Sequence, residues 1–128
     1  GVAARLVTVT LARAFDAGEH AEEAGLIEFA IALDAQGHPD AQAWIDDPAP
    51  WPARRIRPGA ADQAGDVALD EEGWQLRFFA DAGQERDVPV HRICHIEGGL
   101  RPGEVLTLHA PDGKNAAWRV VEVRASSA

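Results

Sequence analysis

The feature that most constrains the fold of this chain is a series of short runs in which apolar and polar residues alternate. The clearest run is residues 26–33, where every second residue from Ile27 to Leu33 is large and apolar, and Glu28 and two alanines lie between them. Residues 5–11 alternate valine or leucine with threonine in the same way. Since successive side chains of a strand point to opposite faces, each run predicts a β-strand with one buried face.

Five further runs are rich in β-branched, aromatic or other apolar residues and are separated by turn residues, so they also predict strands. They span residues 66–70, 74–79, 88–96, 105–108 and 118–123. Gly73, between the first two of them, suits the left-handed backbone of a hairpin turn. Six or seven short strands with at most one helix predict a mainly β protein, either an antiparallel sandwich or a small barrel.

The alternating pattern disappears between residues 35 and 65, where five of the eight prolines lie. Within this stretch, residues 39–46 could form a short helix, because Pro39 suits a first helical turn and Pro48 lies just beyond the end. The remainder predicts one long irregular loop. Irregular connections of this length in a small domain usually carry function, so this segment is a candidate interaction site.

Length and charge limit the class of protein and the kind of partner. A chain of 128 residues predicts a single domain spanning residues 1–128. Its formal net charge of −9 opposes binding to nucleic acid or to an anionic membrane, because both attract positive charge. Neither a stretch of 18 apolar residues nor a signal peptide is visible in the sequence, which predicts a soluble cytoplasmic protein. A leader removed before Gly1 stays compatible with the sequence, and the excess of arginine over lysine predicts a bacterial source.

The sole cysteine, Cys94, lies between His91 and His95, and a thiol with two imidazoles is the raw material of a nucleophilic or a zinc site. On the predicted strand, however, the two histidines would share a face about 13 Å apart, with the cysteine on the opposite face. Two ligands of one zinc ion lie within about 4 Å of each other, so these three residues cannot bind it alone. We therefore expect Cys94 to be a small buried residue and the histidines to be partly exposed. A catalytic site here would need a distant residue such as Asp87 or Glu97.

A second candidate is a metal site in the acidic connection between the first two predicted strands. This connection contains Asp16, His20 and Glu23, which a helical turn would bring together. Acidic connections of this kind are most simply solvated surface, so we predict no metal site. No phosphate-binding loop, zinc-protease motif or nucleophile motif is present in the sequence, and we predict no cofactor.

Residues 51–58 form a basic island in an otherwise acidic chain, with two tryptophans at or near it. Guanidinium groups bind carboxylate or phosphate, and indole rings offer flat contact surfaces, so the island could bind an anion or a partner. Alternatively, the tryptophans cover an open end of the β core and the arginines pair with nearby carboxylates. The candidate binding residues are Trp44, Trp51, Arg54, Arg55 and Arg57.

These observations favour a non-enzymatic binding or assembly module that acts through protein–protein contacts or self-association. The last 30 or so residues, with a Gly-rich turn, a strand, a Pro-Asp-Gly turn and a Val-rich strand, resemble small phage-tail and secretion-apparatus proteins. An unpaired edge strand or the tryptophan-containing loop would then be the contact. The alternative is a small hydrolase or metal-dependent enzyme that uses His91, Cys94 and His95. A third possibility is a small-molecule binder with a cavity at the barrel mouth.

Overall fold

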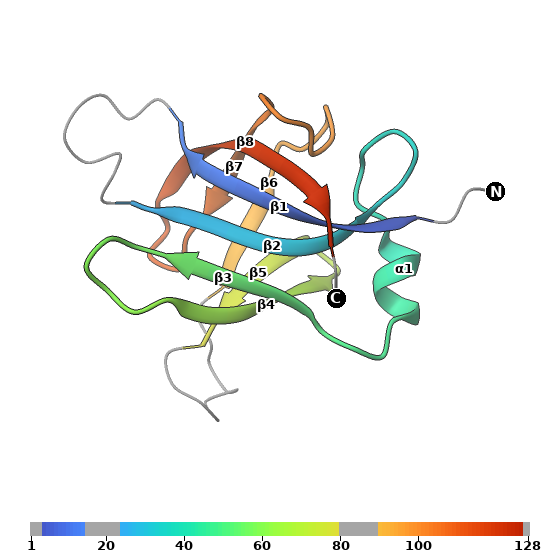
Figure 1. Ribbon diagram of the computed structural model, residues 1–128, viewed down its shortest axis with the longest axis horizontal. Helices are drawn as coiled ribbons and strands as arrows, with labels where there is room; N and C mark the ends of the chain where they lie inside the picture. Colours follow the sequence, from blue (N-terminus) through green and yellow to red (C-terminus); the bar gives the residue numbers. More distant parts are fainter. Residues whose placement is uncertain (1–3, 15–23, 80–89, 127–128) are drawn as a thin grey trace.

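The computed structural model describes residues 4–14, 24–79 and 90–126, which form eight strands and one short helix (Figure 1). The elements in chain order are β1 (Arg5–Arg13), β2 (Leu26–Leu33), α1 (Ala41–Asp46), β3 (Trp51–Ile56), β4 (Gln63–Asp70), β5 (Gly73–Phe78), β6 (Val90–Cys94), β7 (Val105–His109) and β8 (Asn115–Ala125). The prediction of a mainly β protein with one short helix is therefore confirmed.

Each strand pairs antiparallel with the next one along the chain, and β8 pairs with β1 to close the sheet into a barrel. Of the two predicted architectures, the structure is the barrel, with eight strands rather than six or seven. Closure gives every described strand two neighbours, so none of them presents the row of unpaired backbone groups found at a sheet edge.

The additional strand is β3, which lies inside the segment predicted to be an irregular loop. That prediction was wrong, because residues 35–65 contain α1, β3 and the beginning of β4. Pro52 obscured the strand, since proline lacks the N–H that a central strand donates. The register explains how it is accommodated: β2 pairs with β3 only from Ala53 onward, so Pro52 has β4 alone beside it.

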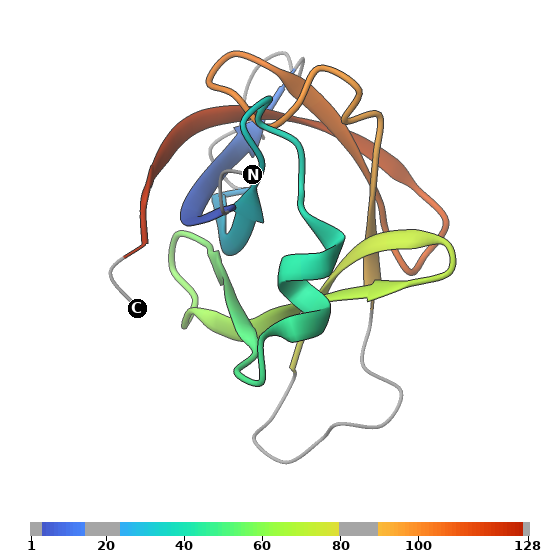
Figure 2. The same cartoon turned by 90° about the vertical axis from the view of Figure 1, so that its right-hand side faces the viewer.

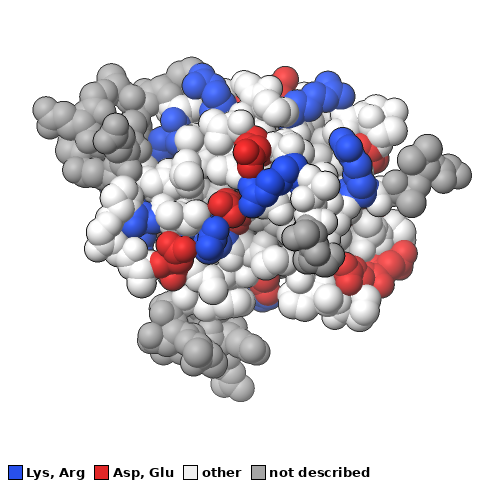
Figure 3. Space-filling model, viewed as in Figure 1, with Lys and Arg blue, Asp and Glu red and all other residues white. Residues whose placement is uncertain are grey.

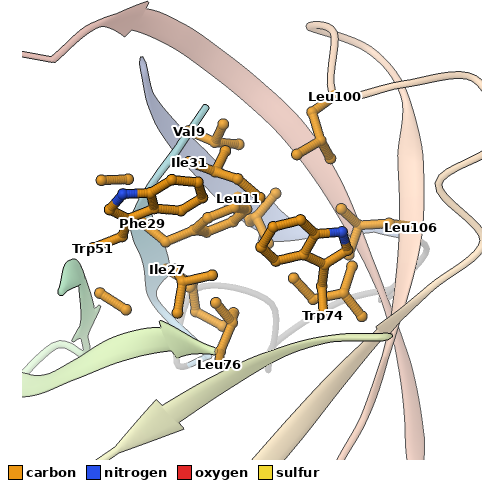
Figure 4. Close-up of a cluster of buried hydrophobic side chains, with 14 of the residues drawn as sticks. Val9, Leu11, Ile27, Phe29, Ile31, Trp51, Trp74, Leu76, Leu100 and Leu106 are labelled. Atoms are coloured by element: carbon orange, nitrogen blue, oxygen red, sulfur yellow. The ribbon is translucent and has the colours of Figure 1, made fainter. Parts of the chain in front are cut away.

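The apolar members of the alternating runs point into the barrel and fill it (Figure 4). An eight-stranded barrel has an interior just wide enough for side chains to fill or for one small ligand. The fully buried side chains include Val9, Leu11, Ile27, Phe29, Ile31, Leu76, Leu106 and Leu108. Apolar side chains therefore fill most of the interior, and whether a cavity remains depends on the residues at its two ends.

Helix α1 lies across one end of the barrel (Figure 2), which we call the closed end. Asp40 caps the helix by accepting a hydrogen bond from the N–H of Ala43 (3.0 Å), and the predicted helix at residues 39–46 is confirmed. The helix has six residues, and in the parts of the chain that the structure describes no helix is long and apolar enough to cross a membrane.

Two stacked indole rings and a leucine complete the closed end. Trp51 and Trp74 stack with their centroids 6.0 Å apart, and Leu100 is buried above them (Figure 4). The loop that carries this leucine is joined to the β2–α1 connection by a hydrogen bond from the N–H of Leu100 to the carbonyl of Gly37 (2.9 Å). Gly99, with φ +83°, lets the two backbones approach, because a Cβ at this position would lie 3.0 Å from the Gly37 carbonyl oxygen.

Candidate functional site

At the end of the barrel opposite α1, which we call the mouth, three strands turn polar residues toward the interior. Arg13 continues on β1 the inward series of valine and leucine. Arg55 on β3 lies opposite the buried Ile27, and His91 on β6 lies opposite the buried Leu76. Since directly opposed residues of antiparallel strands share a face, these cationic and titratable side chains point into the barrel.

These side chains line a cavity of about 410 Å³. Its apolar wall includes Leu108 and Trp118, whose indole is 3% exposed, and the turn between β7 and β8 adds Asp112 and Lys114 at the rim. Pockets of about 300–1,000 Å³ with an apolar wall and a few convergent polar groups are typical of small-molecule sites. The mouth of the barrel therefore has the size and the lining of a ligand pocket.

Arg55 is a half-buried cation whose Nε is buried without a hydrogen-bond partner. Its guanidinium lies 5.9 Å from the ring centroid of Trp118, and the guanidinium of Arg13 lies 5.6 Å from the same ring. Burial lowers the pKa of Arg55, and the positive charges of Arg57 and Arg13 lower it further. The mouth thus concentrates positive charge near one indole ring, in an environment that opposes the charge.

His91 has a similar environment on the opposite wall. Its Nδ1 is buried without a hydrogen-bond partner, and its ring packs edge-on against Phe78 with the centroids 5.5 Å apart. Burial lowers the pKa of His91, the charge of Arg55 lowers it further, and Asp112 raises it in part. His91 is therefore held toward its neutral form, and it has a buried ring nitrogen to which no residue of the described chain is hydrogen-bonded.

Several arginines on the outer face of the barrel are paired with carboxylates, in contrast to Arg55. Arg54 contacts Glu28 at 3.2 Å, Arg77 contacts Asp66 at 2.6 Å, and Arg92 contacts Glu72 at 2.8 Å. On the face shown in Figure 3, basic and acidic side chains lie next to one another. Among the described residues, no carboxylate forms a salt bridge with Arg55.

The basic island predicted from the sequence is divided between different parts of the molecule. Trp51 is 2% exposed and donates from Nε1 to Asp47 (2.8 Å), so it belongs to the core. Trp44 is half-buried on α1 and donates from Nε1 to the carbonyl of Val67 (3.1 Å). Both tryptophans thus cover the closed end, as the second interpretation predicted.

The three arginines of the island also separate. Arg54 points outward and pairs with Glu28 and Asp62, as the second interpretation predicted. Arg57 is exposed beside an apolar hollow on the outer surface. Arg55 alone joins the cavity at the mouth, because the alternation on β3 turns it inward.

The outer hollow beside Arg57 has a volume of about 490 Å³ and is larger than the cavity at the mouth, but it offers fewer polar groups to a ligand. It is lined mainly by apolar groups, including Leu26, Ile56 and Pro58, and it shares Arg13 with the cavity at the mouth. We therefore assign the candidate site to the mouth.

The structure does not bring His91, Cys94 and His95 together. Strand β6 ends at Cys94, so the alternation predicted for residues 88–96 stops before His95, which has φ +62°. His95 is exposed, with Nδ1 3.1 Å from the hydroxyl of Thr107, whereas His91 lines the mouth. Cys94 faces away from the interior and is half-buried, not buried as expected.

The other residues proposed for catalysis or metal binding add nothing to this group. Glu97 is exposed, and its carbonyl is 2.8 Å from Nε2 of His38. Asp87, Asp16, His20 and Glu23 lie outside the described residues. Within residues 4–14, 24–79 and 90–126, no group of three or more His, Cys, Asp or Glu side chains is placed to hold a metal ion.

Sequence reasoning missed most of the pocket, including Arg13, Trp118, Asp112 and Lys114. One local signal was available: Arg13 occupies the next inward position after Val9 and Leu11, and an arginine at such a position marks an interior that is not wholly apolar. The convergence of this residue with Arg55 and His91 depends on barrel closure, which no local pattern encodes.

Comparison of the chain with protein-family models, with curated proteins and with solved structures finds no match.

Proposed function

We propose that this protein binds a small-molecule ligand in the cavity at the mouth of its barrel. The observation that carries the proposal is that Arg55 and His91, each with a buried nitrogen that lacks a hydrogen-bond partner, both line a cavity of about 410 Å³. Leaving a buried polar group unpaired costs about 1–3 kcal/mol, more for a charged group. A ligand that hydrogen-bonds to these atoms would offset that cost, so the free protein is prepared for binding.

The rest of the barrel acts as a rigid scaffold that holds the residues of the cavity in place. The closed end is packed with apolar side chains under α1, and the strands that carry Arg55 and His91 are fixed on both sides by neighbours. Binding residues placed on a closed barrel change little between the free and bound states, which lowers the entropic cost of binding. The described wall of the cavity carries no serine, threonine or cysteine nucleophile, which favours binding over covalent catalysis.

A blocked cavity tests this function. Ala116 lies on the cavity wall, opposite Leu108 on the neighbouring strand, whereas its neighbour Ala117 belongs to the outer face of β8. We expect the wild-type protein to bind at least one of two probes, 2-naphthoate and 2-naphthamide, with one site per chain in isothermal titration calorimetry. Ala116→Phe should abolish that binding, and the matched variant Ala117→Phe should retain it. Equal binding by the wild type and Ala116→Phe would refute the proposal.

Assembly through protein–protein contacts, including a phage-tail or secretion-apparatus role, stays a prediction. The described strands offer no free edge for such a contact, and Trp51 is buried in the core. The outer surface of α1 is the part of the predicted segment that supports it best, because Ile45 is 61% exposed beside the half-buried Trp44. Light scattering over a range of protein concentrations, with Ile45→Glu as the variant, tests self-association directly.

A small hydrolase or metal-dependent enzyme that uses His91, Cys94 and His95 also stays a prediction. It would require the three side chains to converge during turnover, and their separate positions give it no support. Retention of a hydrolytic activity in both His95→Ala and Cys94→Ser would eliminate it.

A further inference from the structure

We infer that the ligand of the mouth is an organic carboxylate with a flat apolar body, whose carboxylate contacts Arg55 and whose body packs against the part of the cavity wall formed by Ala110, Pro111 and Ala116. This inference rests on the proposed function, because it names the chemical class of the molecule that the same cavity would bind.

The charge of the ligand follows from the state of Arg55. Four outward-facing arginines on β3, β5, β6 and β8, namely Arg54, Arg77, Arg92 and Arg124, contact a carboxylate of this chain at 3.6 Å or less. Arg55 is more buried than Arg54, yet among the described residues its charge is balanced only by the face of Trp118. A guanidinium withdrawn from water is stabilised best by an anion that accepts its hydrogen bonds.

The number of hydrogen-bonding atoms and the charge at the rim favour a single negative charge. Two residues of the lining carry a buried nitrogen without a partner, Nε of Arg55 and Nδ1 of His91, and a carboxylate has two oxygens that would accept from them if both side chains turned toward it. Asp112 lies on the same lining and would repel the second charge of a phosphate monoester. Lys114 also lines the cavity, so the chain supplies positive charge to the anion in addition to that of Arg55.

The rest of the cavity wall indicates what kind of body the ligand has. Leu108, Ala110, Pro111, Ala116 and Trp118 supply an apolar surface that a sugar or a polyol would leave poorly hydrogen-bonded. The cavity volume of about 410 Å³ lies at the small end of ligand pockets, which suits a body of one or two rings.

A set of matched probes tests the class. The compounds 2-naphthoate, 2-naphthamide and 2-naphthyl phosphate share one ring system and differ in charge from one negative charge to none to two. In calorimetry at pH 7.5, we expect the wild type to bind 2-naphthoate at least about tenfold more tightly than the uncharged amide, since charge-assisted hydrogen bonds are roughly twice as strong as neutral ones. It should also bind 2-naphthoate more tightly than 2-naphthyl phosphate.

Two neighbouring residues of β3 provide matched variants. Arg55→Gln and Arg54→Gln remove the same charge, but from the inner and the outer face of the strand. We expect Arg55→Gln to reduce the affinity for 2-naphthoate to that for 2-naphthamide, and Arg54→Gln to leave both affinities within about twofold, because exposed ion pairs contribute little. If Arg55→Gln fails to fold, the three affinities of the wild type still decide the class.

The outcomes separate this inference from the proposed function. If the amide binds as tightly as the carboxylate and Arg55→Gln changes neither, the mouth is a ligand site but the carboxylate assignment is wrong. Tighter binding of the naphthyl phosphate would replace the carboxylate by a phosphate and would also overturn the inference. If none of the three compounds binds to the wild type, the carboxylate assignment and the proposed pocket both fail.

Discussion

The two ends of the barrel use the same strands for opposite purposes. On β3, Trp51 and Arg55 point to the same interior, but the tryptophan is 2% exposed with its Nε1 hydrogen-bonded to Asp47, whereas the arginine has a buried Nε without a partner. Among the described residues, no buried side-chain nitrogen or oxygen at the closed end lacks a hydrogen-bond partner, whereas Arg55 and His91 at the mouth each have one that does. Alternation along a strand determines which residues face inward, and position along the barrel axis determines whether such a residue stabilises the core or is held for a ligand.

The largest expected effect is at the closed end. Trp51→Ala should reduce the free energy of unfolding by about 3–5 kcal/mol, because it removes a buried ring and leaves a cavity under α1. Urea unfolding followed by circular dichroism measures this change. A loss below about 1 kcal/mol would show that Trp51 is a surface contact residue, as the first interpretation of the basic island proposed.

At the mouth, removing the charge of Arg55 should raise the stability of the ligand-free protein or leave it unchanged, in contrast to the loss expected at the closed end. Arg55→Met keeps most of the aliphatic volume and removes a half-buried cation that lacks a carboxylate partner among the described residues. Losing the contact with Trp118 costs about 0.5–1 kcal/mol, and removing the unsatisfied group returns about as much. We expect the melting temperature of the ligand-free protein to stay the same or rise. A drop comparable to that of Trp51→Ala would mean that Arg55 has a structural role.

His91 gives the mouth a dependence on pH. Because the pKa of His91 is lowered in the folded protein by burial and Arg55, against the opposing effect of Asp112, the unfolded chain takes up a proton first as the pH falls. The contribution of His91 to stability is therefore complete above the unfolded pKa of about 6.5 and decreases as the pH falls from there toward the folded pKa.

A variant isolates this contribution from that of other titrating groups. Between pH 7.5 and 5.5, the free energy of unfolding of His91→Asn should fall less than that of the wild type in urea titrations. The carboxyls with lowered pKa, Asp34, Asp47 and Asp70, titrate at lower pH and are common to both proteins. Parallel pH profiles would contradict the buried, inward position of His91.

The smallest expected effect is at Cys94, which is half-buried on the outer side of β6 and belongs to neither end's interior. Cys94→Ser should change the free energy of unfolding by less than about 1 kcal/mol, as is usual for substitutions outside the core. Binding of 2-naphthoate should be unaffected. Loss of binding in this variant would instead support a site formed by His91, Cys94 and His95.

The fold was predictable from sequence to the extent that its signals are local. Period-two alternation identified β1 and β2, and a hairpin with Gly73 identified β4 and β5. Strand β3 was missed because Pro52 suggested a loop. The strand accommodates this proline because its pairing with β2 begins only at Ala53. Closure through the pairing of β1 with β8 depends on contacts between the two ends of the chain, so the choice between sandwich and barrel stayed open.

The candidate site was predicted only in fragments. Arg55 was singled out as an anion-binding residue and His91 as a reactive one, but each was grouped with its neighbours in sequence. The structure groups them instead by the face of the strand, so that Arg54 and Cys94 point outward while Arg55 and His91 meet the same cavity. Residues from five strands and one turn contribute to the pocket, and their sequence separations carry no periodic signal.

The four tryptophans allow the contrast between the two ends to be measured in one experiment. Trp44, Trp51 and Trp74 lie at the closed end, and Trp118 lies at the mouth. In ¹H–¹⁵N correlation spectra during titration with 2-naphthoate, we predict that the indole N–H signal of Trp118 shifts progressively, while those of Trp51 and Trp74 stay in place. A shift of Trp44 or Trp51 with Trp118 unchanged would contradict the central claim that the mouth is the ligand site.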